Sequence, residues 1–526
     1  MSYNPSCCRI DNETTQPYEI TAMTKLTQKQ LESHLWESAN ILRGSIDSSD
    51  YKNYIFGMLF LKRLSDVFED EVKTVIEREM AEGRSRAEAE AIAEDPDEHQ
   101  FFVPERARWK NLSQKTFNIG EEIQKAFYAL EEHPNNPALV GVLTPIDFNN
   151  KERLPDVTLL RLIAHFGKMR LGDEEIPNPD MLGDAYMYLI AKFADDAGKK
   201  GGEFYTPRQV VRLLVELLKP TEGMYICDPT VGSGGMLLEC ARYVQEHGGN
   251  PRNLRLFGQE KNLNTWSIAK MNMLLHGRLD AVIEKGDTIR DPKLKRDGQL
   301  MLFNRVLANP PFSLSSWGKE EAEADQSERF QFGVPPASYG DLAFVQHMIA
   351  TLMLDGMCGV VMPHGVLFRG GQEAKIRQGI IEKDWLEAVI GLPPNLFYGT
   401  GIPAAILIFN KAKRKDRTGQ ILFIHAAEGF ANGTNQNVLR DEDVANIVSA
   451  YDAWENQERY ASVVSVDEVR ENDYNLNIPR YVDTVEPEEP VDMDAAIARY
   501  QEAVQARQSA EAKLADHLRR LGMLKD

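Results

Sequence analysis

The chain has 526 residues, which is too long for one ordinary hydrophobic core and favours two or three domains. No apolar run approaches the roughly 18 residues of a membrane-spanning helix, and the N-terminal stretch SYNPSCCRIDNETTQ carries no apolar secretion signal, so we expect a cytoplasmic protein. The net charge of −20 argues against a protein that binds DNA tightly without a partner, because affinity for duplex DNA comes largely from Lys and Arg. The alternative is that the negative charge only keeps the protein in solution.

The cysteines are few and lack the paired CxxC spacing of metal sites. We therefore expect neither a disulfide framework nor a bound metal, and we interpret the cysteines as reduced thiols. They are Cys7, Cys8, Cys227, Cys240 and Cys358.

The N-terminal third of the chain has helical periodicity. Residues 1–22 precede a segment that resembles a helix start at Met23, and we expect them to be a disordered extension. From there LESHLWESANILRG and YIFGMLFLKRLSDVF place apolar residues at helical spacing, and the pattern returns in IGEEIQKAFYALEEH and VTLLRLIAHFGKM. These patterns predict an all-helical domain over residues 23–172, without a catalytic cluster.

A second domain is expected over residues 173–482, beginning around the breaker-rich IPNPD. In it, short apolar runs alternate with helical patterns, which favours an α/β fold with a mostly parallel sheet covered on both faces. The last three runs lie close together and predict an antiparallel edge. The runs occupy residues 224–228, 254–260, 281–287, 305–312, 358–363, 386–393, 404–411 and 421–426.

Residues 483–526 are expected to form a charged, proline-bearing linker and a final helix. The helix shows a heptad in which six of eight positions are apolar, so it needs a packing partner. Packing on the chain's own N-terminal domain and contact with another protein explain the heptad equally well. The heptad positions are Ile497, Tyr500, Val504, Arg507, Glu511, Leu514, Leu518 and Leu521.

The first run of the α/β domain ends in ICDPTVGSGGMLLECA. Asp228 ends the run, and a helix starts near Met236. Glycines in between let the backbone approach a ligand, and free N–H groups at a helix N-terminus favour a carboxylate or phosphate. The turn matches neither the Walker pattern nor G-x-G-x-x-G, and alone it is more often structural than ligand-binding. Its residues are Gly232, Ser233, Gly234 and Gly235.

Acidic residues end the next two runs. Glu260, in FGQEKN, stands where a carboxylate can accept both hydroxyls of a ribose. Asp287, in EKGDTI, stands where it could accept from an adenine amino group. Either residue by itself could simply be a solvated acid, but three polar strand ends in succession favour a ligand that contains adenosine.

The fourth run ends in NPPF, residues 309–312. The exocyclic amine of a purine is a poor nucleophile because its lone pair is conjugated with the ring, and acceptors held against its N–H bonds can localise that lone pair. The side-chain oxygen of Asn309 and the backbone oxygen of Pro310 are such acceptors, while Pro310 and Pro311 keep the turn rigid. Phe312 can stack on a base taken out of the helix. In isolation Asn-Pro is only a turn signal, but its place behind three polar strand ends favours catalysis.

The combination DPTVGSGG followed by NPPF resembles the S-adenosylmethionine-dependent amino-methyltransferases of DNA. More narrowly, GGEFYTPRQVVRLLVELL, NPPF, GLPPNLFYGTGIPAAILIFNK and YNLNIPRYV are similar to the methylation subunit of type I restriction-modification systems. The resemblance covers nearly the whole chain, including ESANILRGSIDSSDYKNYIFGMLFLKRLSD. It implies a Rossmann-like methyltransferase sheet after a helical N-terminal domain, and a site-specific adenine N6-methyltransferase that protects host DNA from cleavage.

The resemblance also implies roles for residues. Asp228 and the Ser233–Gly235 turn would lie beneath the methionine end of S-adenosyl-L-methionine, Glu260 would hold the ribose, and NPPF would receive a flipped adenine. His364, in VMPHGVLFRGG, is interpreted as structural or as flanking the substrate. The segment expected to close over the cofactor is Glu203, Phe204, Tyr205, Thr206, Pro207 and Arg208.

After NPPF the chain has no spare stretch of about 100–150 residues that could form a domain for reading DNA sequence. This agrees with the partners that the resemblance implies. A separate specificity subunit would read double-stranded DNA, two methylation subunits would clamp it, and a restriction subunit could join. The C-terminal helix is a candidate for docking on the specificity subunit.

Three rival functions remain. A methyltransferase of protein glutamine would face the same electronic problem at an amide nitrogen, but such proteins are shorter and usually carry Tyr in place of Phe312. A catalytically silent scaffold is disfavoured because Asn309, Phe312, Asp228 and Glu260 are all present. A methyltransferase that reads its own site is disfavoured by the missing reader domain.

Overall fold

The computed structural model describes residues 25–43, 45–46, 50–176, 179–197, 206–397, 401–433, 436–484 and 492–524. They form two units that divide after Val482. The expected N-terminal extension lies outside the described residues, and so do Glu203, Phe204 and Tyr205. Within the described ranges, no helix is both long and apolar enough to cross a membrane.

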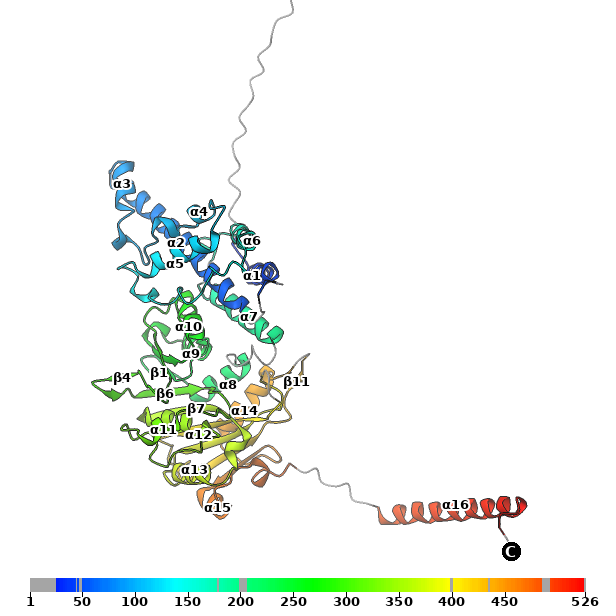
Figure 1. The fold of residues 1–526 in the computed structure, drawn as a ribbon. Helices are drawn as coiled ribbons and strands as arrows, with labels where there is room; N and C mark the ends of the chain where they lie inside the picture. Colours follow the sequence, from blue (N-terminus) through cyan, green and yellow to red (C-terminus); the bar gives the residue numbers. More distant parts are fainter. Residues whose placement is uncertain are drawn as a thin grey trace, which may run out of the picture. The chain divides into compact units, whose positions relative to one another are not determined.

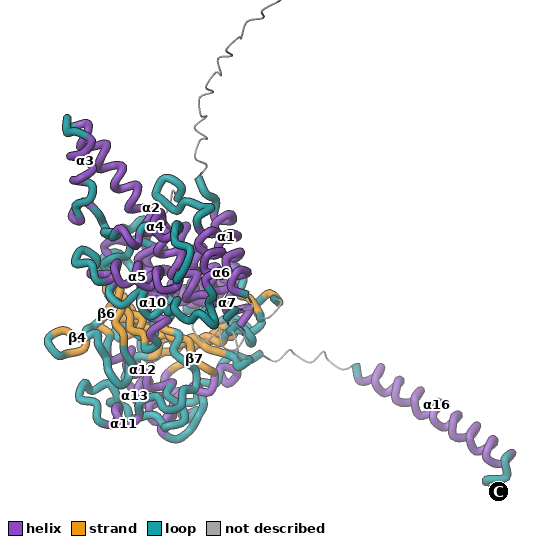
Figure 2. The backbone as a smooth tube through the Cα atoms, turned by 45° about the horizontal axis from the view of Figure 1, so that its top comes forward, coloured by secondary structure: helices purple, strands orange, loops and turns teal. Residues whose placement is uncertain are grey.

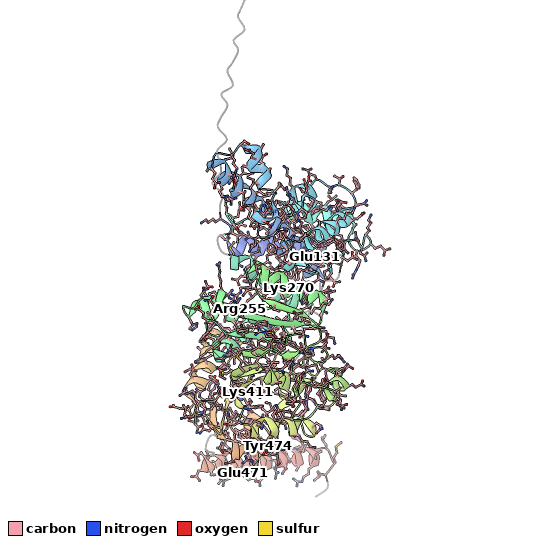
Figure 3. The ribbon with its side chains drawn as sticks, turned by 90° about the vertical axis from the view of Figure 1, so that its left-hand side faces the viewer. Glu131, Arg255, Lys270, Lys411, Glu471 and Tyr474 are labelled. Atoms are coloured by element: carbon pink, nitrogen blue, oxygen red, sulfur yellow. The ribbon has the colours of Figure 1, made fainter. Side chains whose placement is uncertain are left out.

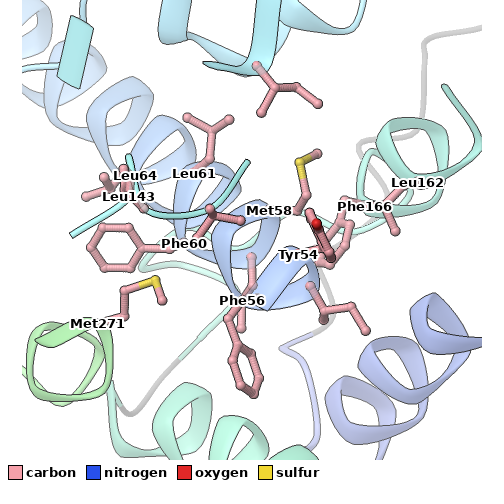
Figure 4. Close-up of a cluster of buried hydrophobic side chains, with 14 of the residues drawn as sticks. Tyr54, Phe56, Met58, Phe60, Leu61, Leu64, Leu143, Leu162, Phe166 and Met271 are labelled. Carbon is pink, nitrogen blue, oxygen red and sulfur yellow. The ribbon is translucent and has the colours of Figure 1, made fainter. Parts of the chain in front are cut away.

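The first unit begins with the predicted helical domain, which is built around the long helix α2 (Figure 1). α1 starts at a capping box, in which the side chains of Thr27 and Gln30 each accept the other residue's backbone N–H. Phe56 and Phe60 reach from α2 into the core and are at most 2% exposed (Figure 4). The helices are α1 (Gln28–Leu42), α2 (Tyr51–Ala81), α3 (Arg86–Ile92), α4 (Trp109–Leu112), α5 (Ile119–Glu131), α6 (Asp156–Phe166) and α7 (Pro179–Ala197). α7 lies in the range expected for the second domain, but its buried apolar side chains belong to the core of the helical domain.

The helical domain and the sheet domain share helix α10 (Leu263–Leu275). Met271 packs into the core of the helical domain (Figure 4), whereas Met273 on the same helix packs into the core beneath the sheet. Figure 3 shows the side chains along this boundary, with Glu131 labelled in the helical domain and Lys270 on α10. One helix therefore contributes to both hydrophobic cores.

A nine-stranded sheet with the order β13-β10-β8-β9-β7-β6-β1-β2-β3 forms the centre of the second domain. β1, β2, β3, β6 and β7 are parallel, β8 and β10 point the same way, and β9 and β13 run against their neighbours. The strands are β1 (Tyr225–Asp228), β2 (Arg255–Glu260), β3 (Val282–Lys285), β6 (Phe303–Ala308), β7 (Leu352–Pro363), β8 (Leu386–Gly391), β9 (Ala404–Asn410), β10 (Gln420–His425) and β13 (Ala461–Ser465).

Helices cover both faces of this sheet (Figure 2). The sequence of β9 is apolar throughout because both of its faces are buried. Ile406 and Ile408 enter the core on one face of the sheet, and Leu407 and Phe409 enter the core on the other. One face is covered by α8 (Arg208–Leu218), α9 (Gly235–Glu246), α10 and α14 (Asp441–Ala453), and the other by α12 (Asp341–Ala350), α13 (Gln372–Glu382) and α15 (Val466–Glu471).

The mostly parallel sheet agrees with the prediction, and each of the eight predicted apolar runs overlaps a strand. The sheet does end in an antiparallel edge, but the last three runs do not form it, because β8 and β10 are parallel to each other and β9 lies inside the sheet. The edge strand is β13, whose segment ASVVS is short and only partly buried, so no strand was predicted there. β9 reverses direction inside the sheet, between β7 and β8. Other short elements of the first unit are the helix α11 (Lys319–Glu323) and the strands β4 (Lys295–Arg296), β5 (Gln299–Leu300), β11 (Ala431–Asn432) and β12 (Asn437–Val438).

The second unit contains the helix α16 (Met493–Arg520). Asp492 caps it by accepting the N–H of Ala495 at 3.0 Å. No residue of α16 is buried, and the heptad residues Tyr500 and Leu521 are 71% and 69% exposed. Within this unit, the described residues therefore leave the apolar heptad stripe uncovered.

Candidate active site

Four parallel strands end next to one another where the strand order of the sheet reverses. β1 lies between β2 and β6, and β3 lies beyond β2. In open α/β sheets, ligands bind outside the carboxyl ends of the strands at such a point. Asp228 ends β1, Glu260 ends β2, and Asn309 follows β6, so the fold brings together three side chains that are far apart in the sequence.

The turn after β1 requires glycine at two positions. Gly232 has a φ of 55° and Gly234 a φ of 85°, a region that L side chains rarely adopt. A Cβ on Gly234 would also lie 2.5 Å from Cε of Met273 on α10. Gly234 is the N-cap of α9, so the turn delivers the free N–H groups of that helix to the edge of the sheet.

Two buried carboxylates lie beside this turn. Glu260 is 9% exposed; its Oε2 accepts the N–H of Gly232 at 3.1 Å, and its Oε1 accepts the N–H of Asn262 at 2.8 Å. Asp228 is 2% exposed and accepts the N–H of Thr230 at 3.0 Å. Burial, together with the charge of Glu260, raises the pKa of Asp228 to about 7, and burial also raises the pKa of Glu260. A cationic ligand group placed here would relieve both carboxylates.

Asp287 makes contacts with its own chain. Its Oδ1 accepts the backbone N–H groups of Ile289 and Arg290, both at 3.0 Å. Its Oδ2 pairs with the guanidinium of Arg290 at 3.0 Å and with Nζ of Lys261 at 2.9 Å. Despite partial burial, these donors lower the pKa of Asp287, so the carboxylate is charged and is already fixed by four donors.

The side-chain amide of Asn309 has its nitrogen hydrogen-bonded and its oxygen unpaired. Its Nδ2 donates to Oγ of Thr206 at 3.0 Å, which links the turn after β6 to the residue just before α8. Its Oδ1 is buried and accepts no hydrogen bond from the described part of the chain. Because buried polar atoms in folded proteins are almost always hydrogen-bonded, an orphaned acceptor at a strand end indicates a missing donor.

Phe312 is half-buried and lies against a second ring. The Phe397 ring, which follows β8, meets it with centroids 5.7 Å apart and an interplanar angle of 65°. This edge-to-face geometry is a favourable aromatic contact. Phe397 is only 6% exposed, so it is a buried support for Phe312, whose own side chain stays partly exposed.

A cavity of about 980 Å³ occupies this edge of the sheet, which is ample for a nucleoside-sized ligand. Of the predicted site residues, Pro207, Gly234, Pro310 and Phe312 do not line it, and Glu203, Phe204 and Tyr205 lie outside the described residues. The predicted residues that line the cavity are Thr206, Arg208, Asp228, Gly232, Ser233, Gly235, Glu260, Asp287, Asn309 and Pro311.

Residues that the sequence did not indicate support this site. Asn272 on α10 is fully buried and donates through Nδ2 to the backbone oxygen of Ser233 at 2.8 Å. Thr288 donates its hydroxyl to the backbone oxygen of Pro229. A lone Asn inside the apolar stretch MNMLL was the available signal for Asn272, and Phe397 lay in the motif LPPNLF without an assigned role. His364 follows β7, and burial lowers its pKa, with His425 contributing.

Comparisons with known proteins place this geometry among DNA methylases. Residues 177–490 match the family N-6 DNA Methylase, and residues 31–166 match the HsdM N-terminal domain. The type I restriction enzyme MjaVII methylase subunit of Methanocaldococcus jannaschii is 33% identical over 504 residues, covering 92% of this chain and 83% of the relative. The HindI methylase subunit of Haemophilus influenzae is 32% identical over 416 residues, covering 74% of this chain and 91% of the relative.

A solved structure shows the same fold. The type I restriction-modification system methyltransferase subunit from Streptococcus thermophilus superimposes with a TM-score of 0.76 at 32% sequence identity. The match covers 87% of this chain and all of the other. The similarity therefore extends through the helical domain as well as the sheet domain.

Proposed function

Because the chain belongs to the N-6 DNA Methylase family, among the methylase subunits of type I restriction-modification systems, we propose that its sheet edge methylates N6 of an adenine swung out of duplex DNA. The observation that carries this assignment is the buried, unpaired Oδ1 of Asn309. An adenine amino group carries the donor that this oxygen lacks. The methylation marks host DNA, which is thereby protected from cleavage.

Asn309 prepares the nucleophile. Its Oδ1 accepts one N–H of the adenine amine, and the backbone oxygen of Pro310 accepts the other, which localises the nitrogen lone pair. Thr206 holds the Asn309 amide in the required orientation through its 3.0 Å contact with Nδ2. The reaction then depends mainly on positioning, because an in-line attack on an activated methyl needs no dedicated base before bond formation.

The residues around the glycine turn fit S-adenosylmethionine, which supplies an electrophilic methyl group when it is bound. Glu260 has already accepted two backbone N–H groups, yet a carboxylate has about four acceptor positions, so it can also accept ribose hydroxyls. Asp228 offers a buried negative charge to the cationic methionine end. Backbone and side-chain donors already occupy the oxygens of Asp287. We therefore assign Asp287 to holding the loop after β3 in place beside the adenine of the cofactor.

Phe312 provides the stacking surface for the extruded base. Base stacking on an aromatic ring contributes about 1–3 kcal/mol, and it tolerates different sequences around the target. The edge-to-face contact with Phe397 keeps the ring in place while the base enters. Neither ring selects a DNA sequence, because stacking does not read the hydrogen-bonding edges of neighbouring base pairs.

Sequence selection is assigned to partners. With a net charge of −20, the chain is poorly suited to hold DNA by itself. A specificity subunit would supply base readout, a second methylation subunit would complete the clamp around the duplex, and a restriction subunit would cleave unmodified DNA. The exposed heptad stripe of α16 is the proposed contact with the specificity subunit. The complex would act on the chromosome in the cytoplasm.

The substitution Asn309→Ala tests this assignment. In the complex with the specificity subunit, it should lower the single-turnover methylation rate by about a hundredfold or more, because a preorganised polar group at the reacting atom is lost. The affinity for S-adenosylmethionine, measured by calorimetry, should change little. A variant with a near-normal rate would refute the role of Asn309.

Two further variants separate acceptor chemistry from orientation. Asn309→Asp keeps acceptor oxygens but loses the donor to Thr206, so it should retain more activity than Asn309→Ala. Thr206→Val removes the acceptor that orients the amide, and it should lower the rate by about tenfold through misorientation. If the chain were a scaffold without catalytic activity, the complex with the natural sequence would not methylate DNA. If it were a protein methyltransferase, it would methylate a glutamine substrate instead.

A further inference from the structure

The turn after NPPF has an unusual backbone conformation. Ser313 directly follows Phe312 and has a φ of 51°, in the left-handed region that disfavours residues with a side chain. Such a conformation persists only where surrounding contacts enforce it, and it is often found at functional sites. The question is which contacts enforce it here.

Asp341 is the residue that holds this turn. It begins helix α12, is fully buried, and accepts the backbone N–H of Ser313 through Oδ1 at 2.7 Å. The N–H of Ser313 belongs to the peptide unit that joins it to Phe312. The hydrogen bond therefore fixes the peptide plane next to Phe312, and with it the backbone torsion that aims the ring.

A guanidinium keeps Asp341 in place. Nη1 of Arg369 donates to the other oxygen of Asp341 at 2.9 Å and lies 3.3 Å from Oε1 of Glu373. The guanidinium also stacks over the ring of Tyr339, 4.0 Å from its centroid. Although partial burial opposes it, Asp341 and Glu373 raise the pKa of Arg369, so its guanidinium is charged and is anchored from several sides.

We propose that Asp341 and Arg369 are positioning residues for methyl transfer, which aim the Phe312 ring at the extruded base by holding Ser313 in its left-handed conformation. Asp341 is fully buried and bonds the backbone of the turn itself, so we assign the pair an action through the turn and not on the reacting atoms. This inference rests on the proposed role of Phe312. It adds a second support for the ring besides Phe397, from the start of α12 and from the segment that follows β7.

The test uses the complete complex with its specificity subunit and two DNAs of the same sequence. One carries adenine at the target position and reports the methylation rate, and the other carries 2-aminopurine there and reports base extrusion by fluorescence, because 2-aminopurine lacks the N6 amine. Asp341→Ala should lower the single-turnover methylation rate at least about tenfold and alter the fluorescence of the extruded base, since a misaimed ring stacks on it differently. Affinity for S-adenosylmethionine should stay within about twofold. Asp341→Asn, which keeps an oxygen facing Ser313, should recover a substantial part of the lost rate.

The control is Asp441→Ala. Asp441 also begins a helix, α14, but its side chain is 79% exposed, so neither rate nor fluorescence should change. If Asp341→Ala fails to fold, Arg369→Gln serves instead. It keeps the hydrogen bond from the Ser313 N–H to Asp341 and removes the donors to Asp341 and to Oγ of Ser313, so it should produce a smaller loss of the same kind. A normal rate and normal fluorescence in either variant would overturn the inference, as would an equal loss of cofactor binding.

Phe312→Ala distinguishes this inference from the proposed function. If Phe312→Ala slows methylation while the folded Asp341 and Arg369 variants do not, only the positioning role is wrong. If Phe312→Ala leaves rate and fluorescence unchanged, the stacking role of Phe312 is wrong, and the positioning role that rests on it is overturned too.

Discussion

Asp228 titrates near neutral pH because it is buried next to a second carboxylate. Its folded pKa of about 7 means that the carboxyl group is half protonated at that pH in the absence of a ligand. A cationic ligand group favours the ionised form, so binding and proton release are linked. The consequence is a pH dependence of cofactor affinity that most surface carboxylates would not produce.

We expect the affinity for S-adenosylmethionine to be constant well above pH 7 and to weaken as the pH falls below it. The loss should approach tenfold per pH unit, because each unit of acidification removes about nine-tenths of the remaining ionised Asp228. Calorimetry at pH 6 in two buffers of different ionisation enthalpy should also reveal proton release on binding. Constant affinity from pH 8 to 5.5 would contradict the assignment.

Asp228→Asn is the matching variant. It cannot ionise, so it should bind the cofactor weakly at every pH and show no proton release between pH 8 and 6. A steep pH profile in this variant would shift the assignment to Glu260, whose pKa burial also raises.

Within the helical domain, α1 and α6 meet at a pair of histidines. The rings of His34 and His165 stack with centroids 4.0 Å apart and an angle of 11° between their planes. His34 is 8% exposed, and its pKa falls to about 4 because of burial and, to a smaller extent, of His165, Lys168 and Lys62. The contact between these helices therefore requires a neutral His34.

Acid should weaken this helix contact. The folded pKa of His34 is below the unfolded value of 6.5, so its contribution to stability is complete above pH 6.5 and is lost as the pH falls from 6.5 to about 4. The loss should be about 2 kcal/mol after allowance for solvent screening. Urea midpoints measured from pH 7 to 4.5 should decline less steeply in His34→Gln than in the natural chain.

His247, which is exposed after α9, is the matched control. His247→Gln should leave the pH profile of the urea midpoint unchanged. If the natural chain and His34→Gln lose stability in parallel on acidification, the histidine pair does not account for acid sensitivity.

At the scale of the whole molecule, the chain divides into a unit that carries the cavity and a separate helical unit. The cavity is lined by residues of the first unit, while α16 in the second has no buried residue. An uncovered heptad stripe needs a partner, because apolar side chains at this spacing gain their free energy only when they are packed. We therefore expect catalysis and assembly to be separable.

Deletion of residues 483–526 should leave cofactor affinity and thermal stability of the first unit nearly unchanged. It should abolish or strongly weaken co-purification with the specificity subunit, and specific DNA binding should be lost with it. Replacement of Tyr500 and Leu514 by Glu in the full chain should have the same effect, since both lie on the heptad stripe. Assembly that survives the deletion would remove α16 from the interface.

Much of this organisation could be predicted from sequence because it depends on local patterns. Helical periodicity, apolar runs and the turn chemistry of Gly232, Gly234 and Asn309 are each visible within a few residues. The structure then brings Asp228, Glu260 and Asn309 to one edge, as the alternation of strands and helices predicted. The roles assigned to them remain proposals that the substitutions above would test.

Other features were decided only by the tertiary structure. The reversal of β9 between β7 and β8, the contact of the Phe397 ring with Phe312, and the bond from Ser313 to Asp341 join residues that are distant along the chain. Local propensity carries no information about which strands become neighbours, and that order decides which loops meet at the edge of the sheet. The sequence by itself determined which groups stand at the strand ends, and the packing of the sheet decided which side chains hold them in place.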